Sequence, residues 1–257
     1  MPYFKTLRDI ILFTGENYFT GEKTGRTGFD LMPITPFYED MKERGYVITP
    51  DFSKEDYDIN DVLKESLEKL NTKASVIEYV YYTQPDGIMH KTGPYSEEAK
   101  SVIKDINDKV ERYANSLPED TLLVISADHG HTAVEPIDLY ACKTLYKYLK
   151  NNPSNDARCL AFRVKDGLHD EFEKTFNQLF GSIYRLLKTE DAIKMGYFGN
   201  PNDSIHSRIK DFLGDFVALA TNKYYFNYVG PDGTVFKSHH AGITKDEMEV
   251  PVIVVRK

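Results

Sequence analysis

Two short segments of this sequence each place a carboxylate and an imidazole directly after a stretch of apolar, β-prone residues. The stretches cover residues 74–82 and 121–126. The four side chains that follow them are Asp86, His90, Asp128 and His129. In an open α/β sheet the carboxyl ends of the strands form the crevice where ligands bind. Because aspartate and histidine suit zinc, manganese or iron, the two pairs predict a metal site that holds one or two ions.

The first pair, Asp86 and His90, is predicted to lie in a loop that leaves a strand. Gly87 lies between the two residues, and glycine allows the sharp turn that would bring both side chains together. The alternative is an aspartate that caps a turn and a histidine on the surface. The preceding strand and the following Gly93-Pro94 favour the metal site.

The second pair is more specific, because Asp128 and His129 are adjacent and are followed by Gly130. Only a sharp turn would let both side chains point into one crevice. His131 comes next, but three adjacent ligands would strain the backbone. His131 is therefore expected to support the ligands from behind or to face solvent.

A third component is needed to close the site, and the segment Ser238-His239-His240-Ala241-Gly242 is the best candidate. Three protein ligands with an open position form the usual arrangement of a catalytic zinc site. Two ions about 3.5–4 Å apart would hold a phosphoryl group during in-line displacement. The residue types alone leave both His239 and His240 open as the ligand.

Composition narrows the class of protein. The chain has 257 residues, a formal charge of −8 and no basic stripe, which argues against a nucleic-acid polymer as the main partner. A phosphate substrate stays possible because bound metal ions supply local positive charge. Two cysteines, Cys142 and Cys159, are too few for a disulfide framework. With no signal peptide and no apolar run of about 18 residues, we expect a cytoplasmic location and no membrane contact.

The pattern of apolar residues predicts a mixed α/β protein with strand–helix–strand order in its middle. A long helix is expected to begin at Ser96 as its N-cap and to join the two strands that precede the candidate ligands. The final apolar run is typical of a buried strand. The other predicted helices are 5–13 (weak), 35–43, 59–71, 137–150, 168–180 and 204–213, the other predicted strands are 159–164, 183–187, 215–220, 223–229 and 250–255, and 15–28 is predicted as a loop.

The break at Asn151-Asn152-Pro153 suggests how these elements are divided. Residues 1–150 and 201–257 are predicted to form one core α/β domain that carries the candidate ligands. Residues 151–200 are predicted to form a small α+β insertion or lid.

Three segments in this order, 82–94, 125–130 and 240–251, resemble the alkaline phosphatase superfamily, and most closely its nucleotide pyrophosphatase/type I phosphodiesterase branch. The motifs that carry the resemblance are Asp86-x-x-x-His90-x-x-Gly93-Pro94, Ser126-Ala127-Asp128-His129-Gly130 and His240-Ala241-Gly242-Ile243-Thr244-x-x-Glu247-Met248-x-Val250-Pro251. The resemblance implies a mixed, mostly parallel sheet flanked by helices, with a small insertion. It also implies hydrolysis of a small phosphoric ester, with the metals activating hydroxyl and water.

By this resemblance, two divalent ions are expected, zinc or manganese. Asp86, His90 and His240 would hold one of them, with His239 as the alternative to His240. Asp128 and His129 would help to hold the other. Other branches, such as the phosphomutases and sulfatases, use related sites.

The sequence departs from the family pattern at its beginning. Family members place a further metal-binding aspartate at the end of their first strand, followed by a serine or threonine nucleophile. Residues 1–60 contain no apolar strand that ends in Asp-Gly and no such nucleophile turn. We therefore expect the chain to correspond to the C-terminal two-thirds of such an enzyme, with the nucleophile unknown. A partner chain or a second copy would supply the missing part, and the lost strand would expose an apolar sheet edge.

Three functions are compatible with these residues. The first is a metal-dependent hydrolase of phosphoric esters, which include phosphodiesters, nucleotide pyrophosphates and phosphomonoesters. The second is a metal-binding remnant without activity, or a subunit that needs a partner to supply the nucleophile. The third is an iron enzyme with one carboxylate and two histidines, Asp86, His90 and His240. The third would leave Asp128 and His129 unexplained.

Overall fold

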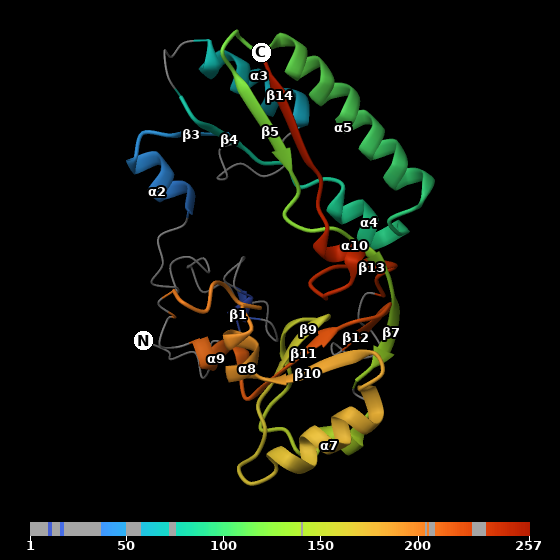
Figure 1. The fold of residues 1–257 in the computed structure, drawn as a ribbon. Helices are drawn as coiled ribbons and strands as arrows, with labels where there is room; N and C mark the ends of the chain where they lie inside the picture. Colours follow the sequence, from blue (N-terminus) through green and yellow to red (C-terminus); the bar gives the residue numbers. More distant parts are fainter. Residues whose placement is uncertain are drawn as a thin grey trace. The chain divides into compact units, whose positions relative to one another are not determined.

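The chain forms two compact units, residues 1–82 and residues 83–257. Figure 1 shows their helices and strands. All candidate metal ligands belong to the second unit. The computed structural model describes residues 10–11, 16–17, 37–49, 58–71, 76–139, 141–203, 205, 209–227 and 235–257.

The first unit is organised around helix α3 and a parallel pair of strands, β3 and β4. Glu78 of β4 joins them, because its carboxylate accepts hydrogen bonds from Thr49 Oγ1 and Ser66 Oγ, both at 2.6 Å. Asp58 caps α3 by accepting from the Asn60 backbone N–H at 2.7 Å. The elements are β1 (Ile10–Ile11), β2 (Glu16–Asn17), α2 (Phe37–Glu43), β3 (Val47–Thr49), α3 (Ile59–Leu70) and β4 (Glu78–Val80).

The helix predicted over 59–71 is confirmed by α3, and the helix predicted to end at Glu43 is confirmed at that end by α2. The expected start of α2 at residue 35 lies outside the described residues. The weak helix predicted over 5–13 is wrong where the structure describes it, because Ile10–Ile11 pairs with Glu16–Asn17 as antiparallel strands. β-branched isoleucine favours this extended backbone. The other residues of 5–13, and residues 15 and 18–28 of the predicted loop, are outside the described part of the chain.

The second unit holds the remaining elements. They are α4 (Asp86–Thr92), α5 (Glu97–Ser116), β5 (Leu122–Ser126), β6 (Thr132–Ala133), β7 (Glu135–Asp138), α6 (Lys143–Tyr146), β8 (Ser154–Asp156), β9 (Cys159–Phe162), α7 (His169–Phe180), β10 (Tyr184–Lys188), α8 (Thr189–Lys194), α9 (Ile209–Leu213), β11 (Phe216–Ala220), β12 (Tyr224–Asn227), β13 (Ser238–His239), α10 (Lys245–Met248) and β14 (Val252–Arg256). Among the helices of the described segments, none has both the length and the apolar character that a membrane span requires.

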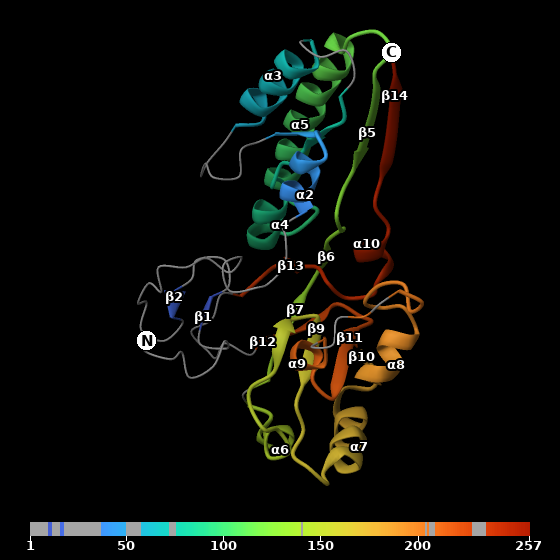
Figure 2. The same cartoon turned by 90° about the vertical axis from the view of Figure 1, so that its left-hand side faces the viewer.

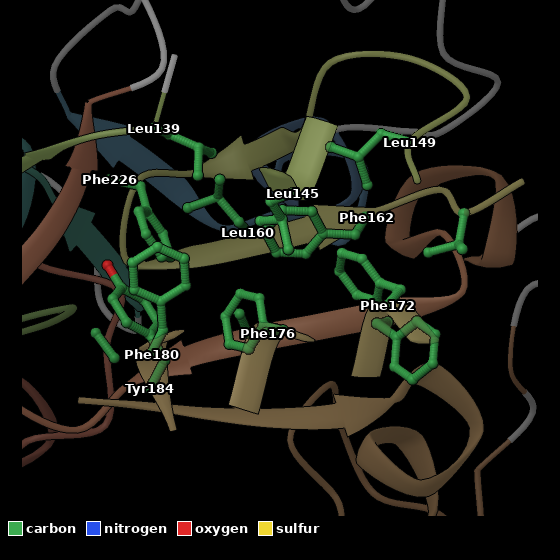
Figure 3. Packing of buried hydrophobic residues seen from close by; sticks show 14 residues of the cluster. Leu139, Leu145, Leu149, Leu160, Phe162, Phe172, Phe176, Phe180, Tyr184 and Phe226 are labelled. Carbon is green, nitrogen blue, oxygen red and sulfur yellow. The ribbon is translucent and has the colours of Figure 1, made fainter. Parts of the chain in front are cut away.

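The largest apolar core of the second unit contains side chains of α7 and of the antiparallel sheet β10-β11-β9-β8. Phe172, Phe176 and Phe180 recur every four residues and so share one face of the helix. The Phe176 ring lies 5.6 Å from that of Phe162 on β9, and the Phe180 ring lies 4.9 Å from that of Phe226 on β12. Figure 3 shows this packing. The predicted helix 168–180 and the predicted strands in this region are confirmed.

This sheet brings β8, β9 and β10 together with β11, which comes later in the chain. The predicted boundary of an insertion at residues 151–200 stays a prediction. Among the described strands, β3–β4 and β7–β12 are parallel pairs, and the other pairs are antiparallel. The mixed α/β class predicted from the sequence is confirmed.

One predicted helix needs correction, and another is described only in part. The helix predicted over 137–150 is wrong for most of its length, because Glu135–Asp138 forms β7 and only Lys143–Tyr146 is helical. β7 pairs with β12, and this contact between distant segments outweighs local helix propensity. The helix predicted over 204–213 is described only from Ile209 to Leu213.

The strand at the C-terminus is present but is not buried. β14 forms an antiparallel ribbon with β5, in which Ile253 lies opposite Ile125 (Figures 1 and 2). Val252, Ile253 and Val254 are 67%, 50% and 58% exposed. The expectation of a buried strand is therefore wrong. β5 matters for the site because it ends at Ser126, two residues before Asp128.

The long helix α5 begins where the sequence predicts, with Ser96 as N-cap. Its hydroxyl oxygen accepts a hydrogen bond from the Ala99 backbone N–H at 3.0 Å. We expect Ser96→Ala to lower the free energy of unfolding by about 1 kcal/mol, because a helix-end donor loses its partner. Urea unfolding followed by circular dichroism measures the change. Ser116→Ala, at the exposed end of the same helix, is the matched control, and an equal effect of both substitutions would contradict the capping role.

Candidate metal centre

Three segments of the second unit supply the candidate ligands. Asp86 and His90 lie on α4, His129 and His131 follow β5, and His240 follows β13. The expectation that Asp86 and His90 lie in a loop is wrong, because both are helical and Gly87 lies inside the helix. Residues four apart in a helix share one face, so helical spacing brings the two side chains together without a sharp turn.

Asp86 is the centre of the cluster. Its Oδ1 lies 2.7 Å from Nε2 of His131, 3.3 Å from Nε2 of His90 and 3.7 Å from Nε2 of His240. The structure thus brings Asp86, His90 and His240 together, which is the set that the sequence places at one ion. It adds His131, whose side chain is only 5% exposed, directly to this set.

The second predicted pair is arranged more openly. The Asp128 side chain is 65% exposed, and its Oδ1 lies 3.8 Å from Nε2 of His129. The His129 ring stacks on the His240 ring with 3.8 Å between centroids. Ligand atoms of Asp86, His129, His131 and His240 all lie within 4.8 Å of one another. His129 therefore approaches the Asp86 cluster, whereas Asp128 and His90 are not part of that group.

Burial lowers the pKa of two histidines of the cluster, His240 and His131. Burial, followed by the charges of His129 and His239, lowers the pKa of His240 to about 4. Burial also lowers the pKa of His131. Burial raises the pKa of Asp86, but its hydrogen bond with His131 and the nearby histidine charges outweigh this and hold the pKa below its usual value. A charged carboxylate among neutral imidazoles is the donor set that binds a divalent cation.

His239 faces a different carboxylate. Its Nδ1 lies 3.5 Å from Oδ1 of Asp156 on β8, and its side chain is 8% exposed. Asp156, His239 and His240 form a second group whose ligand atoms lie within 4.8 Å of one another. Of the two adjacent histidines, His240 is the one whose Nε2 approaches Asp86, and this geometry favours His240 over His239 as the ligand at Asp86.

A buried ion pair supports the segment that carries His240. Arg158 Nε and Nη2 donate to Glu247 Oε1 and Oε2 at 2.5 and 2.6 Å, and both side chains are almost fully buried. Glu247 Oε1 also accepts from the Gly242 backbone N–H at 2.8 Å. Arg158 Nη1 donates to the carbonyl oxygens of Asn222 and Tyr224 at 2.9 and 2.7 Å. The pair therefore fixes the turn that follows His240.

Steric contacts explain why glycine occupies positions 130 and 242 of the two motifs. A Cβ on Gly130 would overlap with the carbonyl oxygen of Asp246, and a Cβ on Gly242 would lie 2.7 Å from Glu247 Oε2. The Gly130 N–H donates to the carbonyl of Glu247 at 2.9 Å. Ala241 has a φ of +74°, an uncommon conformation for a residue with a side chain. Helix α10 thus packs against the histidine loops at van der Waals contact.

The sequence does not show the supporting role of three residues: Ser238, Arg158 and Glu247. Glu247 had a readable signal, because Thr244-x-x-Glu247 is a capping box, and the structure contains it. Arg158 had none, since it lies in the region predicted as an insertion. Ser238 was noted only as a neighbour of the histidines.

Residues 26–242 match the family model described as type I phosphodiesterase / nucleotide pyrophosphatase. No curated protein matches the sequence.

Three solved structures have a similar fold. Murine ectonucleotide pyrophosphatase/phosphodiesterase 5 matches with a TM-score of 0.63 and 19% identity, over 87% of this chain and 64% of that chain. The human protein of the same name matches with a TM-score of 0.65 and 18% identity, over 90% and 68%. An inactive form of the murine protein in complex with AMP matches with a TM-score of 0.62 and 18% identity, over 86% and 63%. This chain thus spans about two thirds of the length of these proteins.

Proposed function

Because this chain belongs to the type I phosphodiesterase / nucleotide pyrophosphatase family, we propose that it is a hydrolase of phosphoric esters that works with divalent metal ions, zinc or manganese. The observation that carries the proposal is the convergence of three imidazole Nε2 atoms on Asp86 Oδ1. A carboxylate and imidazoles at this spacing fit a metal ion.

The proposal assigns the ligands by position. Asp86, His90 and His240 hold one ion, and Asp128 and His129 contribute to holding a second. Bound ions of this kind polarise a phosphoryl oxygen and lower the pKa of a bound hydroxyl or water. The chain's own residues orient the site: α4 fixes Asp86 and His90 on one face, and the Arg158–Glu247 pair fixes the turn after His240. The Asp128 carboxylate is exposed and is therefore accessible to a second ion.

The substrate that we propose is a small phosphodiester or pyrophosphate, such as that of a nucleotide. The family description and the AMP bound to a structural relative support this class. The acidic charge of the chain agrees with a small ester held by metal ions rather than a long polyanion held by basic residues. The nucleophile is not among the residues assigned here, and it would come from another part of the enzyme or from a partner chain.

Metal content and hydrolysis test the proposal together. After equilibration with zinc or manganese, we expect elemental analysis to give about two ions per chain, as in two-metal hydrolases, and about one in Asp128→Ala, because Asp128 is assigned to the second ion only. We expect release of nitrophenol from bis(4-nitrophenyl) phosphate only with metal present.

Asp166→Ala, which removes an exposed carboxylate on another surface, is the control and should change neither result. A wild-type chain that binds no ion, or that hydrolyses the ester equally well after chelation, would contradict the proposed function.

A further inference from the structure

Ser238 lies at the junction between α4 and the histidine that follows Gly130. The residue is fully buried. Its hydroxyl donates to the carbonyl oxygen of Met89 on α4 at 2.7 Å. The same oxygen lies 3.0 Å from Nδ1 of His131, and the Ser238 backbone carbonyl lies 2.8 Å from Nδ1 of His90. One residue therefore contacts the Nδ1 atoms of two histidines.

The positions of the hydrogens follow from this network. A carbonyl oxygen only accepts, so Nδ1 of His90 must donate to Ser238. The single hydroxyl hydrogen of Ser238 points to Met89, so Nδ1 of His131 must donate to the hydroxyl oxygen. A neutral imidazole carries one hydrogen, and each ring therefore leaves Nε2 with a free lone pair.

Both free lone pairs face the same carboxylate oxygen. Nε2 of His131 and Nε2 of His90 lie 2.7 and 3.3 Å from Oδ1 of Asp86. With both rings neutral in this way, the three atoms all carry electron pairs, so a proton or a metal cation must lie among them, and a metal ion can accept all three pairs at once. The arrangement resembles the metal sites in which the second nitrogen of a ligating histidine donates to a protein oxygen.

We propose that His131 is a further ligand, through Nε2, of the ion at Asp86, and that Ser238 is the positioning residue that presents Nε2 of both His131 and His90 to that ion. This inference rests on the proposed function for the presence of the ion. It departs from the sequence-based expectation, in which His131 stood behind the ligands or in solvent.

The number of protein ligands bears on which metal the site can use. With Asp86, His90, His131 and His240, the ion has four protein ligands. A four-coordinate ion would then have no open position for substrate. The site would then suit an ion that accepts at least a fifth ligand, as manganese does and as zinc does when its coordination expands.

A cadmium-113 probe tests the ligand directly in the full chain. With nitrogen-15-labelled histidine, we expect scalar coupling between cadmium and Nε2 of His131, as well as of His90, and a proton on Nδ1 of both rings. Coupling at His90 and His240 without coupling at His131 would overturn the assignment of His131. A proton on Nε2 of His131 in the cadmium-loaded protein would do the same.

Substitution at Ser238 tests the positioning role. We expect Ser238→Ala to weaken zinc binding by about 10–100-fold, the usual effect of losing a partner behind a ligand. The Nδ1 proton signal of His131 should weaken in the same variant, while His90, which uses the retained backbone carbonyl, should keep its signal. Ser238→Thr, which keeps the hydroxyl, should restore both the affinity and the signal.

Ser116→Ala removes an exposed hydroxyl from a helix end and is the control, with no expected change. Unchanged zinc affinity in Ser238→Ala would overturn the role of Ser238. Because none of these measurements uses substrate, a chain that shows the coupling but no hydrolysis would refute the proposed function and support this inference. Metal-dependent hydrolysis without coupling at His131 would support the proposed function and refute this inference.

Discussion

Asp86→Asn is expected to lower the affinity for zinc by more than about 100-fold, beyond the range typical of losing only a partner behind a ligand, and to remove metal-dependent hydrolysis. The reason is that three imidazoles approach one oxygen of this carboxylate, within 3.7 Å. Asparagine keeps the shape but removes the negative charge that offsets the charge of the ion. Titration against a metal-binding indicator gives the affinity, and ester hydrolysis gives the activity.

Two further variants separate the ligands. Asp166→Asn, an exposed aspartate in an ion pair with Lys150, should leave affinity unchanged. His240→Gln should weaken binding strongly, whereas His239→Gln should weaken it less, because His239 faces Asp156 rather than Asp86. Equal affinities of Asp86→Asn and the wild type would show that the cluster does not hold the ion.

The parts of the fold that were predictable have strong local signals. Helices α3, α5 and α7 repeat apolar residues at helical spacing, and Ser96 caps α5 as the sequence indicates. The strands β9 and β11 are short apolar runs between turns, and β10 has apolar residues at Tyr184, Leu186 and Leu187. Local propensity and tertiary contacts agree in these elements, which is why single-sequence reasoning succeeded.

The errors arose where distant contacts decide the structure. The segment 137–150 has apolar residues that suit a helix, and Leu139, Leu145 and Leu149 are indeed buried in the core. Their burial does not come from one helix face, because pairing of β7 with β12 sets the backbone there. The C-terminal run was taken as buried because it is apolar, but apolar composition alone does not determine what covers a strand.

The candidate site was predictable as a set of residue types and not as a geometry. Asp86, His90, Asp128, His129 and His240 were found because ligand types at strand ends, in a family order, are a rare pattern. The residue types of Asp86 and His90 do not show whether they lie in a loop or on a helix. The sequence therefore did not predict that helix α4 carries both. His131 was set aside on backbone strain, whereas the structure carries its ring to Asp86. Arg158 and Ser238 act through contacts with segments far along the chain, which no local pattern encodes.

Removal of Arg158 is expected to be the most destabilising single change at the site. Arg158→Met leaves the carboxylate of Glu247 buried without its partner, and breaking a buried ion pair in this way costs about 3–5 kcal/mol of unfolding free energy. The substitution also removes the Arg158 donor from the carbonyl oxygens of Asn222 and Tyr224, although Tyr224 still accepts from the Tyr184 hydroxyl. Urea unfolding gives the stability. Arg185→Met, which removes an exposed arginine near Tyr197, is the control and should have a much smaller effect.

The double variant Arg158→Met with Glu247→Leu separates charge from shape. We expect it to be more stable than Arg158→Met alone, because no unpaired charge stays buried. It should not reach wild-type stability, since the Gly242 N–H loses Glu247 as its acceptor. A double variant less stable than the single one would contradict the ion-pair account.

The pH dependence of stability gives an independent test of the same pair. Burial raises the pKa of Glu247, but hydrogen bonds from Arg158 and Thr244 outweigh it and hold the pKa below its usual value of 4.5. A carboxyl group with a lowered pKa in the folded state contributes stability above its unfolded pKa and loses it as pH falls through the folded pKa. The stability difference between the wild type and Glu247→Gln should therefore be largest at neutral pH and should shrink below pH 4.5. A difference that stays constant across this range would show that the glutamate acts through its shape alone, and the fixed turn after His240 would then owe nothing to its charge.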